Sequence, residues 1–144
     1  MKNMRSCECL QGETVRMSLP GLPEFVSLAR LTVAAVSNLI GFSIEEVEDL
    51  QVAVSEACTN ALRHGCTKDE CYDLYYTLEK DKLTISVEDK GDGYEPELVS
   101  EPELPGDQAG GFGLFIIKSL MDEVEVISNK GVGTNITMVK YLRN

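Results

Sequence analysis

The segment SEACTNALRHG (55–65) decides how this sequence is interpreted. It lies in a stretch whose apolar residues recur at helical spacing, and it places Glu56, Asn60 and His64 four residues apart. Side chains four positions apart in an α-helix project to one side, so Glu56 and Asn60 point to the same place. A carboxylate and an amide oxygen there suit a hard cation, or a hydroxyl or water that is to be activated. The alternative is an ordinary solvated helix face.

The helix that carries this segment is predicted to begin at about Ile44. Ser43 is its N-cap, Glu46 completes a capping box, and Phe42 is placed to pack on Val47. The residues of its apolar stripe are Val47, Leu50, Val54, Cys58 and Ala61. The residues expected on the opposite side are Glu45, Asp49, Glu56, Asn60 and Arg63.

The flanking segments predict a two-layer fold. ETVRMSL (13–19) alternates as a half-buried strand, and a first helix runs from Pro23 to Gly41. Residues 72–89 predict a hairpin. A long loop rich in Pro and Gly (88–111) precedes a helix at 112–124, and 124–142 predict two strands around a Gly-rich turn. We therefore expect an α/β sandwich: a mixed, mostly antiparallel sheet covered by helices on one face.

Composition limits the function. The 144 residues, 43% hydrophobic, suit a short tail (1–12) and one domain (13–144). A net charge of −11 without a basic run argues against nucleic acid. No apolar leader and no stretch near the roughly 18 apolar residues of a membrane span is present, so we expect a cytoplasmic protein without membrane contact.

Five cysteines, an odd number, argue against a disulfide framework. A zinc site made of Cys58, His64, Cys66 and Cys71 has no recognised ligand spacing. Ordinary thiols are the expected reading.

Three glycine-containing segments follow the ExxxN helix. DKGDG (89–93) ends a strand with an acid and lets backbone approach a ligand, although an Asp/Gly turn is the common alternative. GGFG (110–113) opens a helix whose free N–H groups suit phosphate, but it is neither a P-loop nor a dinucleotide fingerprint. GVGTN (131–135) is either a plain hairpin turn or a turn that offers the Thr134 hydroxyl to a ligand.

The order of these four segments resembles the nucleotide site of the ATPase superfamily shared by DNA gyrase B, Hsp90, histidine kinases and MutL, which has the Bergerat fold. Within that superfamily, SEACTNALRHG, VEDKGDGYEP (87–96) and GGFGLFIIKSLMDEVEV (110–126) closely resemble the anti-sigma factor serine kinases of the RsbW and SpoIIAB type. The resemblance extends from about residue 13 to nearly the end of the chain.

The resemblance implies ATP and Mg²⁺ as cofactors and a role for each motif residue. Asn60 would coordinate Mg²⁺, and Glu56 would be the base that polarises the attacking hydroxyl. Asp89 would accept a hydrogen bond from the adenine amine, Gly91 and Gly93 would let the base lie close, and Thr134 would support the same contact through a water.

The resemblance also implies an ATP lid at about 94–110. The residues implied to offer N–H groups to the phosphates are Gly110, Gly111, Phe112, Gly113 and Leu114. For His64, local packing and a direct role both stay open.

The partners implied are an anti-anti-sigma STAS-domain protein, phosphorylated on serine or threonine, and a sigma factor, with the chain itself a homodimer. A second hypothesis is a switch protein of the same fold that binds nucleotide and a partner but phosphorylates nothing. Glu56 favours the kinase, because a binding module needs no base. A scaffold independent of nucleotide would require all four motifs to be chance turns.

Overall fold

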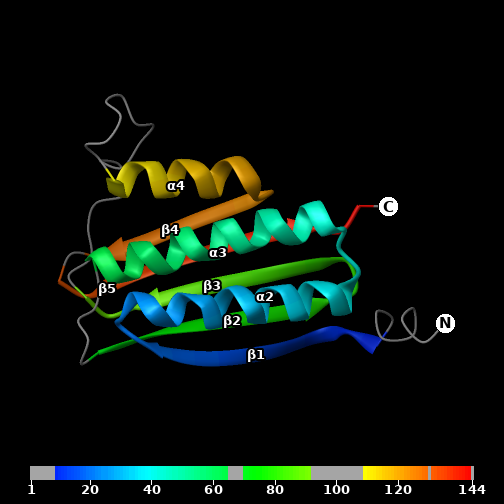
Figure 1. The fold of residues 1–144 in the computed structure, drawn as a ribbon, viewed down its shortest axis with the longest axis horizontal. Coiled ribbons are helices and arrows are strands. Elements are labelled where there is room, and N and C mark those ends of the chain that lie inside the picture. Colours follow the sequence, from blue (N-terminus) through cyan, green and yellow to red (C-terminus); the bar gives the residue numbers. More distant parts are fainter. Residues whose placement is uncertain (1–8, 65–69, 92–108, 130, 144) are drawn as a thin grey trace.

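The computed structural model describes residues 9–64, 70–91, 109–129 and 131–143 (Figure 1). Gly93 and positions 94–108 of the predicted lid lie outside these residues. The elements, in chain order, are β1 (Gln11–Pro20), the 3-10 turn η1 (Pro23–Phe25), α2 (Val26–Ile40), α3 (Ile44–His64), β2 (Cys71–Glu79), β3 (Lys82–Asp89), α4 (Ala109–Leu120), β4 (Glu123–Asn129) and β5 (Gly133–Tyr141).

The strands form one sheet in the order β1-β2-β3-β5-β4, and the three helices lie on one face of it (Figure 1). This confirms the predicted two-layer sandwich. Every pairing among the described strands is antiparallel, so the sheet lacks the mixed character that the sequence suggested. The reason is visible in the connections: α2 and α3 run back and forth between β1 and β2, so β2 returns opposite to β1.

The predicted C-terminus of the first helix and the predicted start of the second are confirmed, whereas Pro23–Phe25, predicted to begin the first helix, form the 3-10 turn η1 before α2. The N–H of Ser43 donates to Glu46 Oε1 at 2.8 Å, and the N–H of Glu46 donates to Ser43 Oγ at 3.1 Å. These two bonds are the reciprocal pair of a capping box, which fixes where α3 begins. α2 ends at Gly41, whose φ of 110° is the left-handed conformation typical of a helix C-terminus.

The core lies between the sheet and the helices. Alternate residues of β2 and β3 are buried, as the predicted hairpin requires: Tyr72, Leu74, Tyr76, Leu78, Leu83, Ile85 and Val87. The hydroxyl of Tyr76 donates to the carbonyl oxygen of Ala29 at 3.1 Å, which ties β2 to α2. The opposite face of the sheet carries the intervening residues.

The last helix differs from its prediction at both ends. The sequence predicts a helix at 112–124, whereas α4 spans Ala109–Leu120. Glycine has low helix propensity, which is why the apolar pattern placed the boundary after Gly111, although the GGFG segment was itself expected to open a helix. At the other end, Val124 and Val126 alternate with Glu123 and Glu125 in β4, because pairing with β5 overrides the helical pattern.

Candidate nucleotide site

The Glu56 carboxylate and the Asn60 amide occupy different environments on α3. Asn60 is only 5% exposed, whereas Glu56 is half-buried. The side opposite the apolar stripe, on which the sequence grouped Asn60 with Glu45, is therefore not uniformly exposed. α3 packs against both α2 and α4, so its buried side is wide and extends through Ala53 and Ala57 to Asn60 (Figure 1). A solvated helix face does not describe this position.

Glu56 lies against the start of α4. A Cβ atom placed on Gly113 would lie 3.2 Å from Glu56 Oε1, which is closer than most real Cβ contacts. The glycine therefore lets the backbone of α4 approach the carboxylate. This contact places a potential general base beside the helix start to which the sequence assigned phosphate binding.

Because α4 begins at Ala109, the N–H groups that are available for a phosphate differ from the predicted set. The first four N–H groups of a helix have no partner within the helix. In α4 they include Ala109, Gly110 and Gly111, and Phe112 is the first residue whose N–H bonds within the helix. Gly113 and Leu114 lie one step further along, where N–H groups bond within the helix, and the Leu114 side chain is buried in the core. Of the predicted phosphate donors, Gly110 and Gly111 are thus the ones whose N–H groups are available.

Asp89 closes β3 with a buried carboxylate, 5% exposed. The N–H of Gly91 donates to Asp89 Oδ1 at 2.9 Å, and the N–H of Thr134 also donates to this carboxylate. Burial raises the pKa of Asp89, and these two N–H groups and nearby His64 oppose the rise. The Asp/Gly turn is thus formed, with its acid aimed toward the helix side of the sheet.

His64 ends α3 close enough to Asp89 for their charges to interact. Burial lowers the pKa of His64 and Arg63 lowers it further, while Asp89 raises it. α3 and β3 therefore bring the ExxxN segment and the DKGDG segment to one end of the fold.

Thr134 lies directly opposite Asp89 in the β3–β5 pairing and is itself buried. Its hydroxyl lies 2.7 Å from the hydroxyl of Ser128, its partner on β4. A hollow of about 340 Å³ at this end of the sheet includes Asp89 and Thr134 in its lining, but its other lining residues include Glu88, Ile127 and Asn135, which occupy the strand positions facing away from the helices.

Gly133 permits the contact between Asp89 and Thr134. Its φ is +144°, and a Cβ there would overlap the carbonyl oxygen of Asp89 and lie 2.9 Å from Cα of Lys90. Gly131 also has a positive φ, +84°, but a Cβ there would meet nothing within 4 Å. The two glycines of the same turn therefore differ in what they do: only Gly133 is required by close packing.

We expect Gly133→Ala to destabilise the protein well beyond Gly131→Ala. Backbone strain at positive φ costs about 1–3 kcal/mol in either variant, and the overlap with β3 adds to it only at Gly133. Urea unfolding of both variants measures the difference. Equal losses of unfolding free energy would show that the contact with Asp89 is unimportant.

The family to which this chain belongs is shown by its similarity to known proteins. Residues 19–140 match the family described as the histidine kinase-like ATPase domain. The serine-protein kinase RsbW of Oceanobacillus iheyensis is 39% identical over 138 residues, covering 89% of this chain and 86% of that protein. RsbW of Halalkalibacterium halodurans is 36% identical, with 92% and 86% covered. This chain belongs to the RsbW family of histidine kinase-like ATPases.

The RsbW assignment agrees with a solved structure. The RsbU and RsbW domains of a Mycobacterium tuberculosis protein superpose with a TM-score of 0.66 at 18% identity, covering 92% of this chain and 33% of that one. At this identity the likeness concerns the fold alone. RsbW of Staphylococcus aureus, at 37% identity over 90% of this chain and 87% of that protein, adds a further relative by sequence.

In this RsbW-family chain, described residues of all four predicted segments come together: Glu56 lies against Gly113, Asp89 pairs with Thr134, and the charges of Asp89 and His64 interact. Gly93 lies outside the described residues. The sequence analysis missed Ser128 and Gly133. A glycine directly before Thr134 was a signal for close packing, whereas nothing local marked Ser128.

Two other features are absent from the residues that the structure describes. In those residues, no three side chains of His, Cys, Asp or Glu gather in an arrangement for a metal ion, and Cys66 of the imagined zinc cluster lies outside them. None of the helices in that same part of the chain has the length and apolar character needed to cross a membrane.

Proposed function

We propose that this chain is an ATP-dependent anti-sigma factor kinase that binds a sigma factor and phosphorylates a serine or threonine of an anti-anti-sigma STAS-domain protein. Its membership of the RsbW serine-protein kinases supports the reaction class. We place it in the cytoplasm and expect it to act as a homodimer.

The observation that carries this proposal is the position of Glu56. Its carboxylate lies against α4 at Gly113, next to the N–H groups that the first turn of α4 presents. A helix N-terminus attracts phosphate oxygens through those groups and through its dipole. A carboxylate beside them is well placed to take the proton of an incoming hydroxyl as the terminal phosphate is transferred. A protein that only bound nucleotide would have no use for it.

The residues present fit Mg²⁺. This ion is usually held by one or two protein oxygens together with phosphates and waters. Asn60 supplies a buried amide oxygen one helical turn from Glu56, so one wall of the site carries an oxygen ligand suited to the ion. When bound, Mg²⁺ supplies neutralisation of the charge on the phosphates. Asn60 is the residue we assign to hold it.

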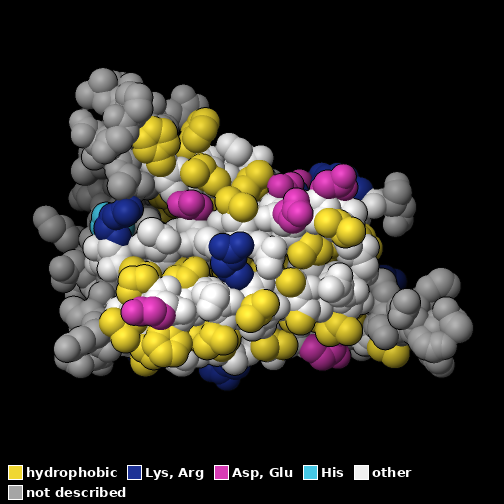
Figure 2. All heavy atoms as spheres, viewed as in Figure 1, with side chains coloured by type: hydrophobic (Ala, Val, Ile, Leu, Met, Phe, Trp, Pro, Cys, Tyr) yellow, Lys and Arg dark blue, Asp and Glu magenta, His cyan; other side chains and the backbone are white. Residues whose placement is uncertain are grey.

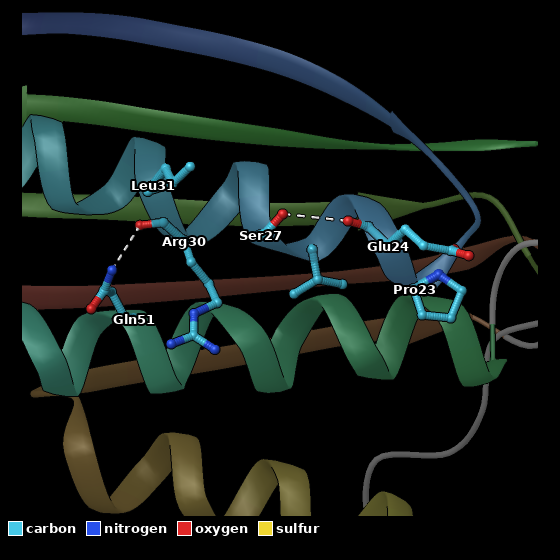
Figure 3. A pocket seen from close by; sticks show the side chains of 7 residues that line it. Pro23, Glu24, Ser27, Arg30, Leu31 and Gln51 are labelled. Atoms are coloured by element: carbon cyan, nitrogen blue, oxygen red, sulfur yellow. Dashed lines mark hydrogen bonds between the residues drawn. The ribbon is translucent and has the colours of Figure 1, made fainter.

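A protein that binds protein partners needs exposed surface for them, and α2 has exposed apolar side chains. Apolar side chains gather on the helix face of the molecule (Figure 2). Leu28, Leu31 and Leu39 of α2 are among the exposed ones. Beside them, a groove of about 500 Å³ includes Arg30 and Gln51 in its lining, and Gln51 Nε2 donates to the carbonyl oxygen of Arg30 at 3.2 Å (Figure 3). Exposed apolar surface of this kind supports protein partners.

The proposal is tested by measuring phosphoryl transfer from γ-labelled ATP, with Mg²⁺, to a STAS-domain protein whose gene neighbours the gene for this chain. Label on a serine or threonine of that protein is the expected result. The alternative function, a nucleotide-gated binding protein, predicts ATP-dependent association with the same protein and no transfer. Association without label from any STAS-domain partner would favour that alternative.

Asp89→Asn tests the adenine contact. The amide keeps an oxygen for the N–H of Gly91, but it loses the charge that strengthens a hydrogen bond from the adenine amine. We expect ATP affinity to fall about ten-fold or more, with the preference for ATP over GTP reduced. Calorimetry with both nucleotides measures this, and Asp81→Asn, an exposed site before β3 with the same change of charge, is the control. Equal binding of ATP and GTP by the unmodified protein would contradict the assignment.

A further inference from the structure

Three strand ends present polar side chains in one row on the helix side of the sheet. Asp89 of β3 pairs with Thr134 of β5, and Thr134 pairs with Ser128 of β4. Asp89 and Thr134 are buried and Ser128 is half-buried. The row therefore runs outward from a carboxylate, through one hydroxyl, to a second hydroxyl on the edge strand.

The two hydroxyls are joined by a short hydrogen bond whose direction is free. Their oxygens lie 2.7 Å apart, and either can donate. Ser128 Oγ also lies 3.5 Å from the carbonyl oxygen of Gly133, a second and longer acceptor. If Ser128 donates to Gly133, Thr134 donates to Ser128 and offers a ligand only lone pairs. If Ser128 donates to Thr134, the hydrogen of Thr134 is available to a ligand.

The second arrangement matches adenine and opposes guanine. Adenine carries an amine donor next to a ring nitrogen that accepts, and guanine carries a carbonyl next to a ring N–H. A carboxylate that accepts, beside a hydroxyl that donates directly or through one water, pairs with both adenine groups. With guanine, the accepting carboxylate would face the carbonyl oxygen and the donating hydroxyl would face the ring N–H. Neither pair can form a hydrogen bond, which is costly in a buried site.

We propose that Ser128 is a specificity-determining positioning residue, which holds the Thr134 hydroxyl as a donor when the base is bound and so sets the preference for ATP over GTP. This inference rests on the proposed base site at Asp89 and Thr134. Ser128 acts through Thr134 and does not touch the nucleotide.

The chain provides a matched control on the other face of the same sheet. Ser86 Oγ lies 2.9 Å from the hydroxyl of Thr137, again a half-buried Ser–Thr pair between neighbouring strands. Both hydroxyls also lie within hydrogen-bond distance of Asn135 Oδ1, at 3.3 Å and 2.8 Å. Asp89 and Thr134 are each three residues from this pair, and side chains three apart along a strand point to opposite faces. Ser86→Ala therefore removes the same kind of bond without altering the row beside Asp89.

The test compares affinities for Mg·ATP and Mg·GTP by calorimetry, with thermal unfolding of each variant. Ser128→Ala is expected to lower ATP affinity about 3- to 10-fold, the effect of one neutral hydrogen bond, and to lower the ATP/GTP ratio by a similar factor. Ser128→Thr should retain the ATP/GTP ratio. Ser128→Val, whose side chain has the shape of threonine but no hydroxyl, should lower it. Ser86→Ala should leave the ratio unchanged. The Thr/Val pair also keeps the test valid if Ser128→Ala does not fold.

The outcomes separate the inference from the function on which it rests. If Asp89→Asn or Thr134→Val lowers the ATP/GTP ratio and none of the Ser128 variants does, Ser128 has no role in specificity and the base site stands. A similar fall in Ser86→Ala would also overturn the inference, because the effect would then follow general loosening of the sheet. If the unmodified protein binds both nucleotides equally, the base site and the inference both fail.

Discussion

Glu56→Gln is expected to lower phosphoryl transfer to the STAS-domain substrate by about 10²- to 10⁴-fold, the usual effect of losing a general base. The amide has the shape of the carboxylate, so it fits the same space against Gly113. It cannot take the proton of the incoming hydroxyl. Affinity for Mg·ATP should change little, because Asn60 and the N–H groups of α4 are untouched. Single-turnover transfer measured beside nucleotide binding separates the two effects.

The control for Glu56→Gln is Glu48→Gln, two helical turns earlier on α3, where the side chain is exposed. It makes the same change of charge on the same helix and should leave transfer unchanged. Transfer by Glu56→Gln at nearly the rate of the unmodified protein would remove Glu56 from the role of base. Parallel losses of transfer and of Mg·ATP affinity would instead mean that Glu56 helps to hold the nucleotide.

Features governed by neighbouring residues could be predicted from the sequence. The capping box at Ser43 and Glu46, the end of α2 at Gly41 and the alternation along 72–89 each depend on bonds or periodicities within a few residues. The structure reproduces all of them. Together they were sufficient to predict two layers, with the helices on one face of the sheet.

Features governed by distant segments could not be predicted in this way. The sequence grouped Asn60 with polar residues opposite the apolar stripe, because a single stripe predicts packing against one neighbour, whereas α3 packs against both α2 and α4. Ser128 looks like any polar residue of an edge strand until β4 pairs it with Thr134. Gly133 is required only because β3 ends against it. In each case the deciding contact comes from another part of the chain.

Because the Asn60 side chain is buried, we expect Asn60→Ala to abolish measurable Mg²⁺-dependent ATP binding. A ligand at a surface position can be replaced by water with little consequence, since Mg²⁺ retains waters readily. At 5% exposure, the alanine leaves an apolar group where the ion requires an oxygen. ATP affinity measured with Mg²⁺ and with EDTA isolates the metal-dependent part. In the unmodified protein Mg²⁺ should strengthen binding, and in Asn60→Ala the two values should coincide.

Two further variants distinguish a metal ligand from a packing residue. Asn60→Asp keeps an oxygen at the site and should retain the response to Mg²⁺, although burial of a carboxylate lowers stability without the ion. Asn38→Ala makes the same chemical change at an exposed position of α2 and should alter neither value. If Asn60→Ala folds and still binds ATP more tightly with Mg²⁺ than with EDTA, the ion is held elsewhere. The buried amide would then serve the packing of α3 between its neighbouring helices, and the assignment of the metal to this wall would be wrong.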